Sequence, residues 1–169
     1  MKKIMEMLQN MKAKNEKKDN KGFSLVELII VIAIMAILVG IVGTQVIPYI
    51  NKSKVAKDQQ VLNSISTAAV TAYSENGLTG DLTIDNVFDT SLSGDKKTVA
   101  DDIISTSGYK DLAEFKKALG SDAGSAVATV KVVFDATNHK VTTSVTYGKG
   151  ADNKDINPKY KIKDVEATL

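Results

Sequence analysis

One carboxylate lies where the sequence should carry no charge. Glu27 is the only charged residue between Phe23 and Ile50, a segment dominated by Val, Ile and Leu. An ionised side chain within membrane hydrocarbon costs at least about 2.5 kcal/mol, so this carboxylate requires a partner or a function. Cleavage after Gly22 would create a partner by freeing the α-amino group of Phe23. In a helix that starts at Phe23, residues 23 and 27 share one side, and the amine of a neighbouring copy could meet the carboxylate.

The remaining sequence offers little catalytic chemistry. His139 is the only histidine and falls in a predicted hairpin turn, where we expect it to be exposed to solvent. The chain has no cysteine, and it contains no Gly-x-Ser-x-Gly elbow, no P-loop and no histidine pair that could supply a nucleophile or bind a metal. We therefore expect a protein that is not an enzyme and that has no catalytic, cofactor or metal site.

Two groups of acidic and amide residues are weak candidates for cation binding. The first group could crowd oxygen ligands around calcium and consists of Asp152, Asn153, Asp155 and Asn157. Its spacing fits no established calcium motif, so we interpret it as a solvated loop. The second group, Asp81, Asp85 and Asp89, is interpreted as acidic scatter that favours solubility.

The distribution of charge predicts how the chain is oriented. Residues 1–22 hold seven lysines against three acidic residues, a balance of +4, whereas the remainder has 15 lysines and 17 acidic residues, a balance of −2. The basic character thus belongs to the leader and gives no support for nucleic-acid binding by the rest of the chain. A basic segment before an apolar one stays in the cytoplasm, which places the C-terminal portion outside.

The apolar segment has two simple alternative interpretations. A secretory signal peptide has a shorter apolar core, followed by a site of small residues. Here the helix reaches about 25 residues, which at ~1.5 Å per residue is enough to span the ~30 Å of a bilayer. An uncleaved membrane anchor explains this length, but it explains neither Glu27 nor the Gly22-Phe23 junction. A lipoprotein is excluded because there is no cysteine to acylate.

The pattern Gly22-Phe23-Ser24-Leu25-Val26-Glu27-Leu28, followed by an apolar run, closely resembles the class III signal of type IV pilins and related pseudopilins. The resemblance implies that a prepilin peptidase cuts between Gly22 and Phe23 and that the same enzyme N-methylates Phe23. It also implies that Glu27 is needed for assembly, by neutralising a neighbouring subunit's terminal amine or a partner in the assembly platform. The long leader is similar to that of type IVb pilins, whereas Phe23 at the junction is similar to type IVa, so the subclass stays open.

The expected fold class is α+β, with a long N-terminal helix packed on a small antiparallel sheet. We divide the chain into a cleaved leader (1–22), a hydrophobic helix (23–50), an amphipathic helix (51–76) and an αβ-loop with a β-meander (77–169). The glycines at 40 and 43, together with Pro48, predict a kink near residues 40–48. The apolar stripe of the second helix consists of Val55, Leu62, Ile65, Ala69 and Ala72. Asn76-Gly77 should end this helix.

Beyond Gly77 the pattern predicts fewer elements. A short helix is expected over Lys110–Leu119 with Asp111 as its N-cap. Alternation with a period of two predicts a hairpin, with strands over 130–135 and 141–147, and a third strand over 160–166. Residues 78–109 and 148–158 are predicted to be surface loops.

These features lead to one principal functional hypothesis. An apolar rod exposed to water must be buried against other copies, and head-to-tail packing of identical subunits gives a helical filament. We expect the major pilin of a type IV pilus, held in the cytoplasmic membrane with its N-terminus inside and then moved to the cell surface by an assembly platform and its ATPase. The alternatives are a minor pilin, a pseudopilin of type II secretion or competence, and a membrane-anchored extracellular binding domain. Whether a filament would serve twitching motility, adhesion, biofilm formation or DNA uptake stays open.

Overall fold

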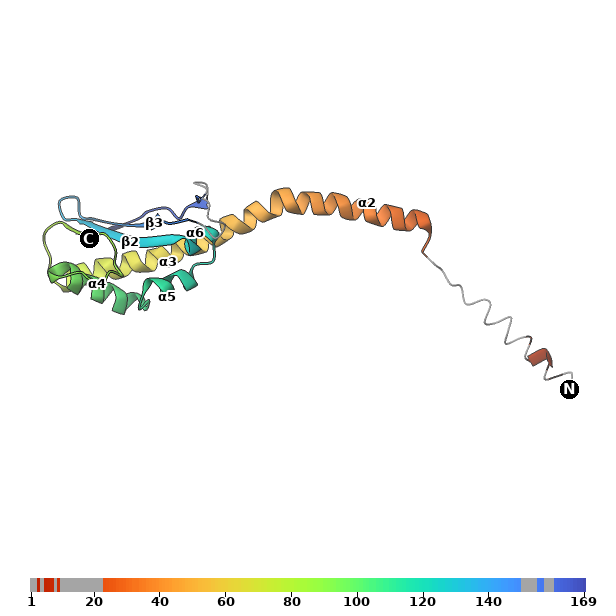
Figure 1. The fold of residues 1–169 in the computed structure, drawn as a ribbon, viewed down its shortest axis with the longest axis horizontal. Helices are drawn as coiled ribbons and strands as arrows, with labels where there is room; N and C mark the ends of the chain where they lie inside the picture. The colour runs from red at the N-terminus through yellow and green to blue at the C-terminus, as the bar shows by residue number, and fades with distance from the viewer. Residues whose placement is uncertain (1–2, 4, 8, 10–22, 150–154, 157–159) are drawn as a thin grey trace. The chain divides into compact units, whose positions relative to one another are not determined.

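The computed structural model describes residues 3, 5–7, 9, 23–149, 155–156 and 160–169, as Figure 1 shows. The chain divides into two compact units, Met1–Gln45 and Val46–Leu169. The fold is α+β, with a long N-terminal helical region and a four-stranded antiparallel sheet, which confirms the predicted class.

The first unit contains the apolar helix α2, Leu25–Ile41. None of its residues is buried, and its aliphatic side chains are exposed along the whole length. A short π-helix, η1, follows at Val42–Val46. The Thr44 hydroxyl donates a hydrogen bond back to the Gly40 carbonyl at 3.0 Å. The regular α-helical pattern therefore breaks inside the segment 40–48, where the sequence predicts a kink.

The second unit begins with α3, Ile47–Glu75. Pro48 lies in its first turn and has no N–H to donate, so the helical hydrogen-bond pattern is interrupted where η1 leads into α3. Leu62, Ile65 and Ala69 are fully buried, which confirms the predicted apolar stripe, although Val55 at its start is only half-buried. The helix ends at Glu75 because Gly77 adopts a left-handed conformation, with φ of 63°.

The sheet has four antiparallel strands in the order β1-β2-β3-β4. They are β1 (Leu82–Ile84), β2 (Val127–Asp135), β3 (Lys140–Tyr147) and β4 (Val165–Thr168). The predicted hairpin is confirmed as β2 and β3, with Phe134 opposite Val141 and Val130 opposite Val145. β1 lies in a region that was predicted to be loop.

The predicted third strand is partly wrong, because the sheet contains only its C-terminal part, β4. The main chain at Ile162 instead binds a side chain of β3: its N–H donates to the Tyr147 hydroxyl at 2.7 Å, and its carbonyl accepts from that hydroxyl at 3.2 Å. Lys163 exchanges two similar hydrogen bonds with the side chain of Gln59, at 2.8 and 2.9 Å. The main chain at Ile162 and Lys163 is therefore held by side chains of β3 and α3 instead of by a neighbouring strand.

Three shorter helices lie between β1 and β2: α4 (Gly94–Ser107), α5 (Leu112–Ala118) and α6 (Asp122–Ser125). α5 confirms the predicted helix, since the Asp111 carboxylate caps it by accepting from the Glu114 N–H at 2.7 Å. α4 overturns the prediction that residues 78–109 are surface loop. It escaped prediction because only Val99, Ala100 and Ile103 of its 14 residues are buried.

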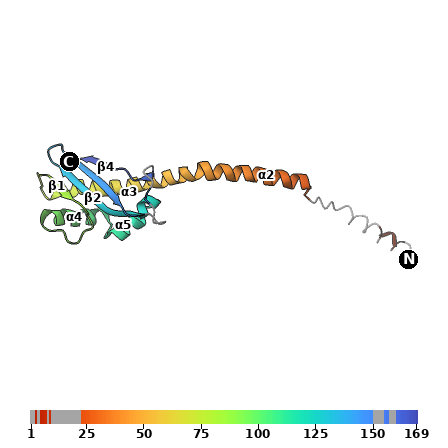
Figure 2. The ribbon, with the colours of Figure 1, turned by 45° about the horizontal axis from the view of Figure 1, so that its top comes forward.

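The core of the second unit lies where α3 contacts β3, β4 and α4 (Figure 2). The ring of Tyr73 stacks on that of Phe134 with centroids 4.9 Å apart. The buried ring of Phe115 contacts Phe88 and Tyr109, at 5.7 and 5.4 Å, and so fixes α5 to the loop segments before it.

The acidic scatter predicted to serve solubility also has structural partners. Asp81 accepts from the N–H of Ala136 at 2.9 Å and ties β1 to the hairpin turn. The Asp85 carboxylate pairs with Lys131 at 2.8 Å, and this hydrogen-bonded lysine lowers the pKa of Asp85. Asp89 accepts from the N–H and the hydroxyl of Ser91, which lowers the pKa of Asp89 in the same direction.

Candidate functional site

The candidate site is the N-terminal end of α2, where Ser24 and Glu27 hold each other. Ser24 is the N-cap, with an extended backbone (φ −63°, ψ 141°), and its hydroxyl accepts from the Val26 N–H at 3.3 Å. In return, the Ser24 N–H donates to Oε2 of Glu27 at 2.8 Å. The two residues therefore form a capping box, which satisfies donors that the first helical turn leaves free.

This capping box gives Glu27 a partner within its own chain. The carboxylate lies in the first turn, where the positive end of the helix dipole stabilises a negative charge. Only Oε2 is engaged, and Oε1 accepts no hydrogen bond from any residue that the structure describes. Glu27 is exposed, and the side chains around it in α2 are aliphatic. The arrangement thus leaves one carboxylate oxygen available to a cation brought by another chain.

Phe23 lies outside the helix, contrary to the prediction that the helix starts there. α2 starts at Leu25, and the extended backbone of Ser24 separates Phe23 from it. Phe23 and Glu27 are therefore not stacked on one helical face. Phe23 itself is 83 % exposed. Gly22, the other half of the predicted junction, lies outside the described residues.

The capping box was readable from the sequence but was missed. Ser24 and Glu27 have the Ser-x-x-Glu spacing, and an apolar run follows them, which is the pattern that marks a helix start. The cost of a charge in a membrane predicts a role for Glu27 but none for Ser24. The structure adds Ser24 as the residue that orients Glu27.

A second polar cluster surrounds Asp58 in the second unit and was not predicted. Asp58 of α3 is fully buried, and its carboxylate accepts from the N–H of Gly120 at 2.7 Å and from the N–H of Ser121 at 3.1 Å. The Ser121 hydroxyl also donates to it. This cluster joins α3 to the segment between α5 and α6. All of its polar groups are used within the fold, so we interpret it as structural.

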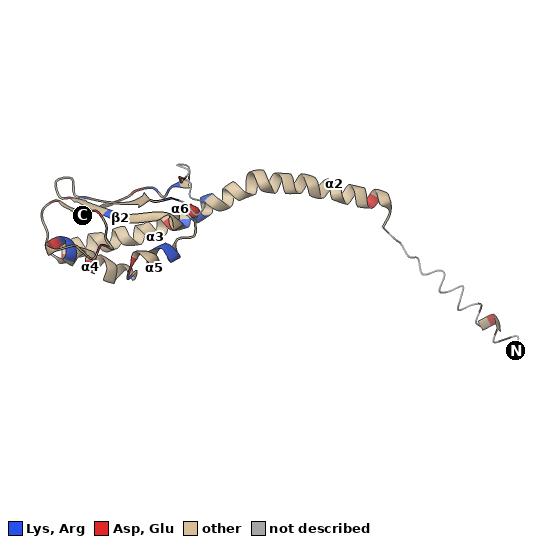
Figure 3. Cartoon of the chain, viewed as in Figure 1, with Lys and Arg blue, Asp and Glu red and all other residues tan. Residues whose placement is uncertain are grey.

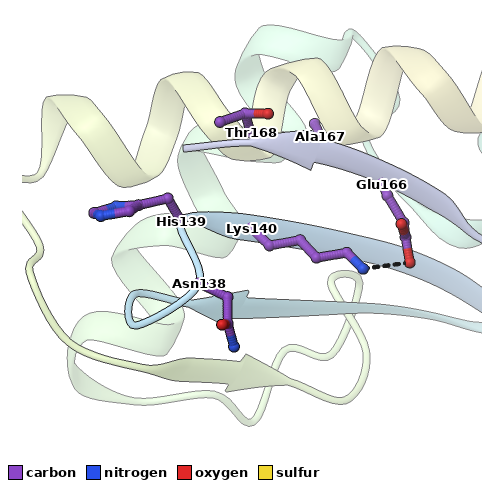
Figure 4. A pocket seen from close by; sticks show the side chains of 6 residues that line it. All are labelled: Asn138, His139, Lys140, Glu166, Ala167 and Thr168. Carbon is purple, nitrogen blue, oxygen red and sulfur yellow. Dashed lines mark ion pairs between the residues drawn. The ribbon is translucent and has the colours of Figure 1, made fainter.

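His139 lines a shallow hollow of about 250 Å³ with Asn138, Lys140 and residues 166–168 (Figure 4). As predicted, it is an exposed residue of the hairpin turn, and its φ of 51° reflects that turn. Lys140 pairs with Glu166 at 2.6 Å, and in Figure 4 the imidazole of His139 points away from this pair. Among the described residues, none forms a hydrogen bond or an ion pair with the imidazole.

No group of three or more His, Asp or Glu side chains is placed to hold a metal ion in the part of the chain that the structure describes. Of the loop considered for calcium, only Asp155 is described, and its carboxylate pairs with Lys149 at 2.9 Å. The lysine lowers the pKa of Asp155. Residues 152, 153 and 157 lie outside the described residues.

Comparison with known proteins agrees with the site at the start of α2. Residues 17–43 match the family described as the prokaryotic N-terminal methylation motif. This motif is typical of type IV pilin and pseudopilin prepilins, which confirms the resemblance seen in the sequence. No curated protein and no solved structure matches the chain.

The motif and the apolar helix together imply three properties. The motif implies processing by a prepilin peptidase, and it is typical of structural, pilin-type proteins, which are not enzymes. Within the described residues, one helical stretch, Leu25–Glu75, is long and apolar enough to cross a membrane. Motif and helix together indicate membrane anchoring.

Proposed function

We propose that this prepilin-type chain is the major pilin of a type IV pilus, cut between Gly22 and Phe23 and N-methylated at Phe23. The observation that carries the proposal is Glu27, held by Ser24 at the head of a helix whose side chains are all uncovered. An ordinary membrane anchor needs no carboxylate at that position. A subunit whose first helical turn must pack against another copy needs a carboxylate there.

The uncovered surface of α2 supports assembly rather than permanent anchoring. Exposed aliphatic residues continue from Leu25 through the π-helix to Ile50 at the start of α3. Soluble monomers rarely expose contiguous apolar patches of more than a few hundred Å². Lipid covers this surface while the subunit is stored in the cytoplasmic membrane. Outside the cell, helices of other copies must cover it, and the apolar area buried at about 25 cal/mol per Å² makes such a bundle cohesive.

Glu27 contributes charge neutralisation at the moment of assembly. Removal of the leader gives Phe23 a positive amine, and this amine needs a carboxylate once the subunit enters an apolar bundle. Oε2 of Glu27 stays on the Ser24 N–H, while Oε1 is free to accept from the amine of the neighbouring subunit. A charged pair with good hydrogen bonds offsets part of the cost of removing both ions from water. In this proposal the helix cap orients the carboxylate before the partner arrives.

The partners follow from this role. They are other copies of the chain, the prepilin peptidase that also methylates Phe23, and an assembly platform with its ATPase. The second unit forms the surface of the filament and performs no catalysis in this proposal. No feature of the described residues favours the minor pilin, the pseudopilin or the membrane-anchored binding domain, and these remain alternative outcomes of the test.

The test combines electron microscopy of sheared surface material with mass spectrometry of its N-terminal peptide. Filaments built mainly of a chain that starts at methylated Phe23 would support the proposal. A chain that is cut at Phe23 but stays in the membrane fraction would favour a minor pilin or a pseudopilin. An intact Met1 terminus would contradict the processing step and would favour an uncleaved membrane anchor.

A further inference from the structure

Three lysines follow the apolar segment in the first turns of α3, and a tyrosine lies at the end of that segment. Lys52, Lys54 and Lys57 are exposed, and so is Tyr49, at 70 %. The Nζ atom of Lys52 lies 5.5 Å from the centroid of the Tyr49 ring. We call these three lysines, together with Tyr49, the lysine collar. Neither processing nor filament packing through α2 gives the collar a role.

The three collar lysines have no carboxylate partner among the described residues. The ion pairs of the second unit are formed by other lysines, namely Lys97 with Asp101, Lys131 with Asp85, Lys140 with Glu166 and Lys149 with Asp155. Asp58 is the nearest acid along α3, but it is buried and bound to Gly120 and Ser121. The collar therefore leaves three positive charges open to a partner outside the chain.

The collar lysines leave the helix on two sides. At about 100° per residue, Lys54 and Lys57 lie within about 60° of each other around the axis, and Lys52 lies about 140–160° from both. The half-buried Asn51 and Val55 and the buried Asp58 occupy part of the remaining arc. One face of a protein partner reaches only one of these two sides, whereas a lipid leaflet reaches both. This placement favours a layer of anions around the exposed part of the helix.

The depth of the collar also fits a membrane surface. At about 1.5 Å per residue, Lys52 lies about 3 Å beyond Ile50 and Lys57 about 10 Å beyond it. The headgroup layer occupies about 5–7 Å on each side of the hydrocarbon, and the lysine stem is long enough to bring its ammonium group back into that layer. Tyr49 is the type of residue that sits at this interface, with its ring toward hydrocarbon and its hydroxyl toward water.

More lysines gather at the same end of the second unit. Hydrogen bonds from Gly120 to Asp58 and between Lys163 and Gln59 hold the end of α5 and the segment before β4 beside the first turns of α3. These segments carry Lys116, Lys117, Lys161 and Lys163. The exposed acids on or beside these segments are Asp111, Glu114, Asp122 and Asp164. Blue segments accordingly appear at the start of α3 and on α5 in Figure 3.

We infer that the lysine collar binds the anionic headgroups of the outer leaflet and fixes the depth at which the stored subunit sits in the membrane. The inference rests on the proposed function only in requiring that the chain span the membrane. Lysines near an anionic surface gain affinity that is additive and is weakened by salt. Extraction of the subunit must then break these contacts as well as remove α2 from lipid.

The experiment uses the full chain in nanodiscs of phosphatidylcholine, with or without phosphatidylglycerol. Lysines are acetylated briefly and the modification of each is read by mass spectrometry. We expect the collar lysines to react about fivefold more slowly when phosphatidylglycerol is present, and to regain their reactivity at high salt. Lys96 on α4 is the internal control, because it is exposed and forms no ion pair with any described residue.

A second readout separates binding from mere proximity to the membrane. Native mass spectrometry counts the lipids that stay on the chain when it is released from the nanodisc. Wild type should retain phosphatidylglycerol in preference to phosphatidylcholine, and the variant Lys52→Gln/Lys54→Gln/Lys57→Gln should lose this preference. The variant Lys96→Gln/Lys97→Gln/Lys110→Gln removes the same charge elsewhere and should keep it.

Three results would overturn the inference. Equal reactivity of the collar lysines in both membranes, for a chain that spans the nanodisc, would refute lipid binding and leave the proposed function intact. Protection that appears only in assembled filaments would show that carboxylates of a second copy are the partner. A chain that fails to span the nanodisc at all would contradict the inference and the proposed function together.

Discussion

Glu27 offers the sharpest test, because its helix cap and its charge can be removed separately. In Glu27→Gln the amide oxygen can still accept from the Ser24 N–H, at the position where Oε2 now accepts at 2.8 Å, so the capping box survives and the charge is lost. In Ser24→Ala the charge survives and the hydroxyl of the cap is lost. Loss of a cap costs about 1 kcal/mol. Glu27→Ala removes both contributions.

The proposed function predicts that the charge dominates. Without a carboxylate, the amine of Phe23 is buried in the bundle with no counter-ion, and breaking a buried ion pair costs about 3–5 kcal/mol, which corresponds to at least about a hundredfold fewer assembled subunits. We expect Glu27→Gln and Glu27→Ala to be processed normally and to give few or no filaments. Ser24→Ala should lose about fivefold or less.

The assay compares filament yield in sheared material with the amount of cleaved subunit in the membrane fraction. Normal cleavage of each variant is the control, because it shows that the chain was inserted and recognised. Abundant filaments from Glu27→Gln would refute the pairing argument and assign Glu27 to helix capping. Abundant filaments from Glu27→Ala would show that assembly needs neither the charge of Glu27 nor its part in the helix cap.

Further predictions concern the second unit, tested on the full chain in detergent by urea unfolding, followed through the tyrosine signal. Asp58→Ala leaves buried N–H groups without acceptors and should lower the free energy of unfolding by about 2–4 kcal/mol; an unchanged midpoint would contradict the buried cluster. Gly124→Ala brings a Cβ to 2.5 Å from Cβ of Leu119 and 2.7 Å from Oδ2 of Asp58, and should cost about 1–3 kcal/mol. Hydrogen bonds from the Asn138 side chain and main chain lower the pKa of Asp135 in the folded protein. This carboxylate therefore stabilises the fold above its unfolded pKa near 3.8, and the stabilisation is lost as the pH falls through the lower folded pKa. Asp135→Asn should therefore reduce the loss of stability in acid, and an acid response equal to that of wild type would contradict this.

The elements with strong periodicity were predictable from the sequence. The apolar run, the stripe of α3 and the alternation of β2 and β3 each repeat one spacing over many residues, and Gly77 marks the helix end through its positive φ. The same holds for α5, whose Asp111 cap has a clear sequence signature. In these segments local preference and tertiary packing agree.

The remaining elements depend on contacts between residues far apart in the sequence. β1 has only three residues and is a strand because Leu82 and Ile84 pair with Phe134 and Val132, about fifty residues away. The segment before β4 alternates like a strand, yet its main chain is bound by Tyr147 and Gln59. At the candidate site, Glu27 was identified by the cost of its charge, whereas Ser24 escaped notice although the capping box is a local pattern.

The edges of the sheet have a consequence for the proposed function, in which the protein is stored in many copies. An exposed strand edge can pair with another chain and start aggregation, and short, charged edge strands reduce this hazard. Here β1 has three residues and β4 has four, and Glu166 in β4 is held by Lys140 of the neighbouring strand. Neither edge gives an incoming strand a long template. In the proposed filament, crowded subunits would therefore associate through their apolar helices without the competing risk of joining their sheets into amyloid-like ribbons.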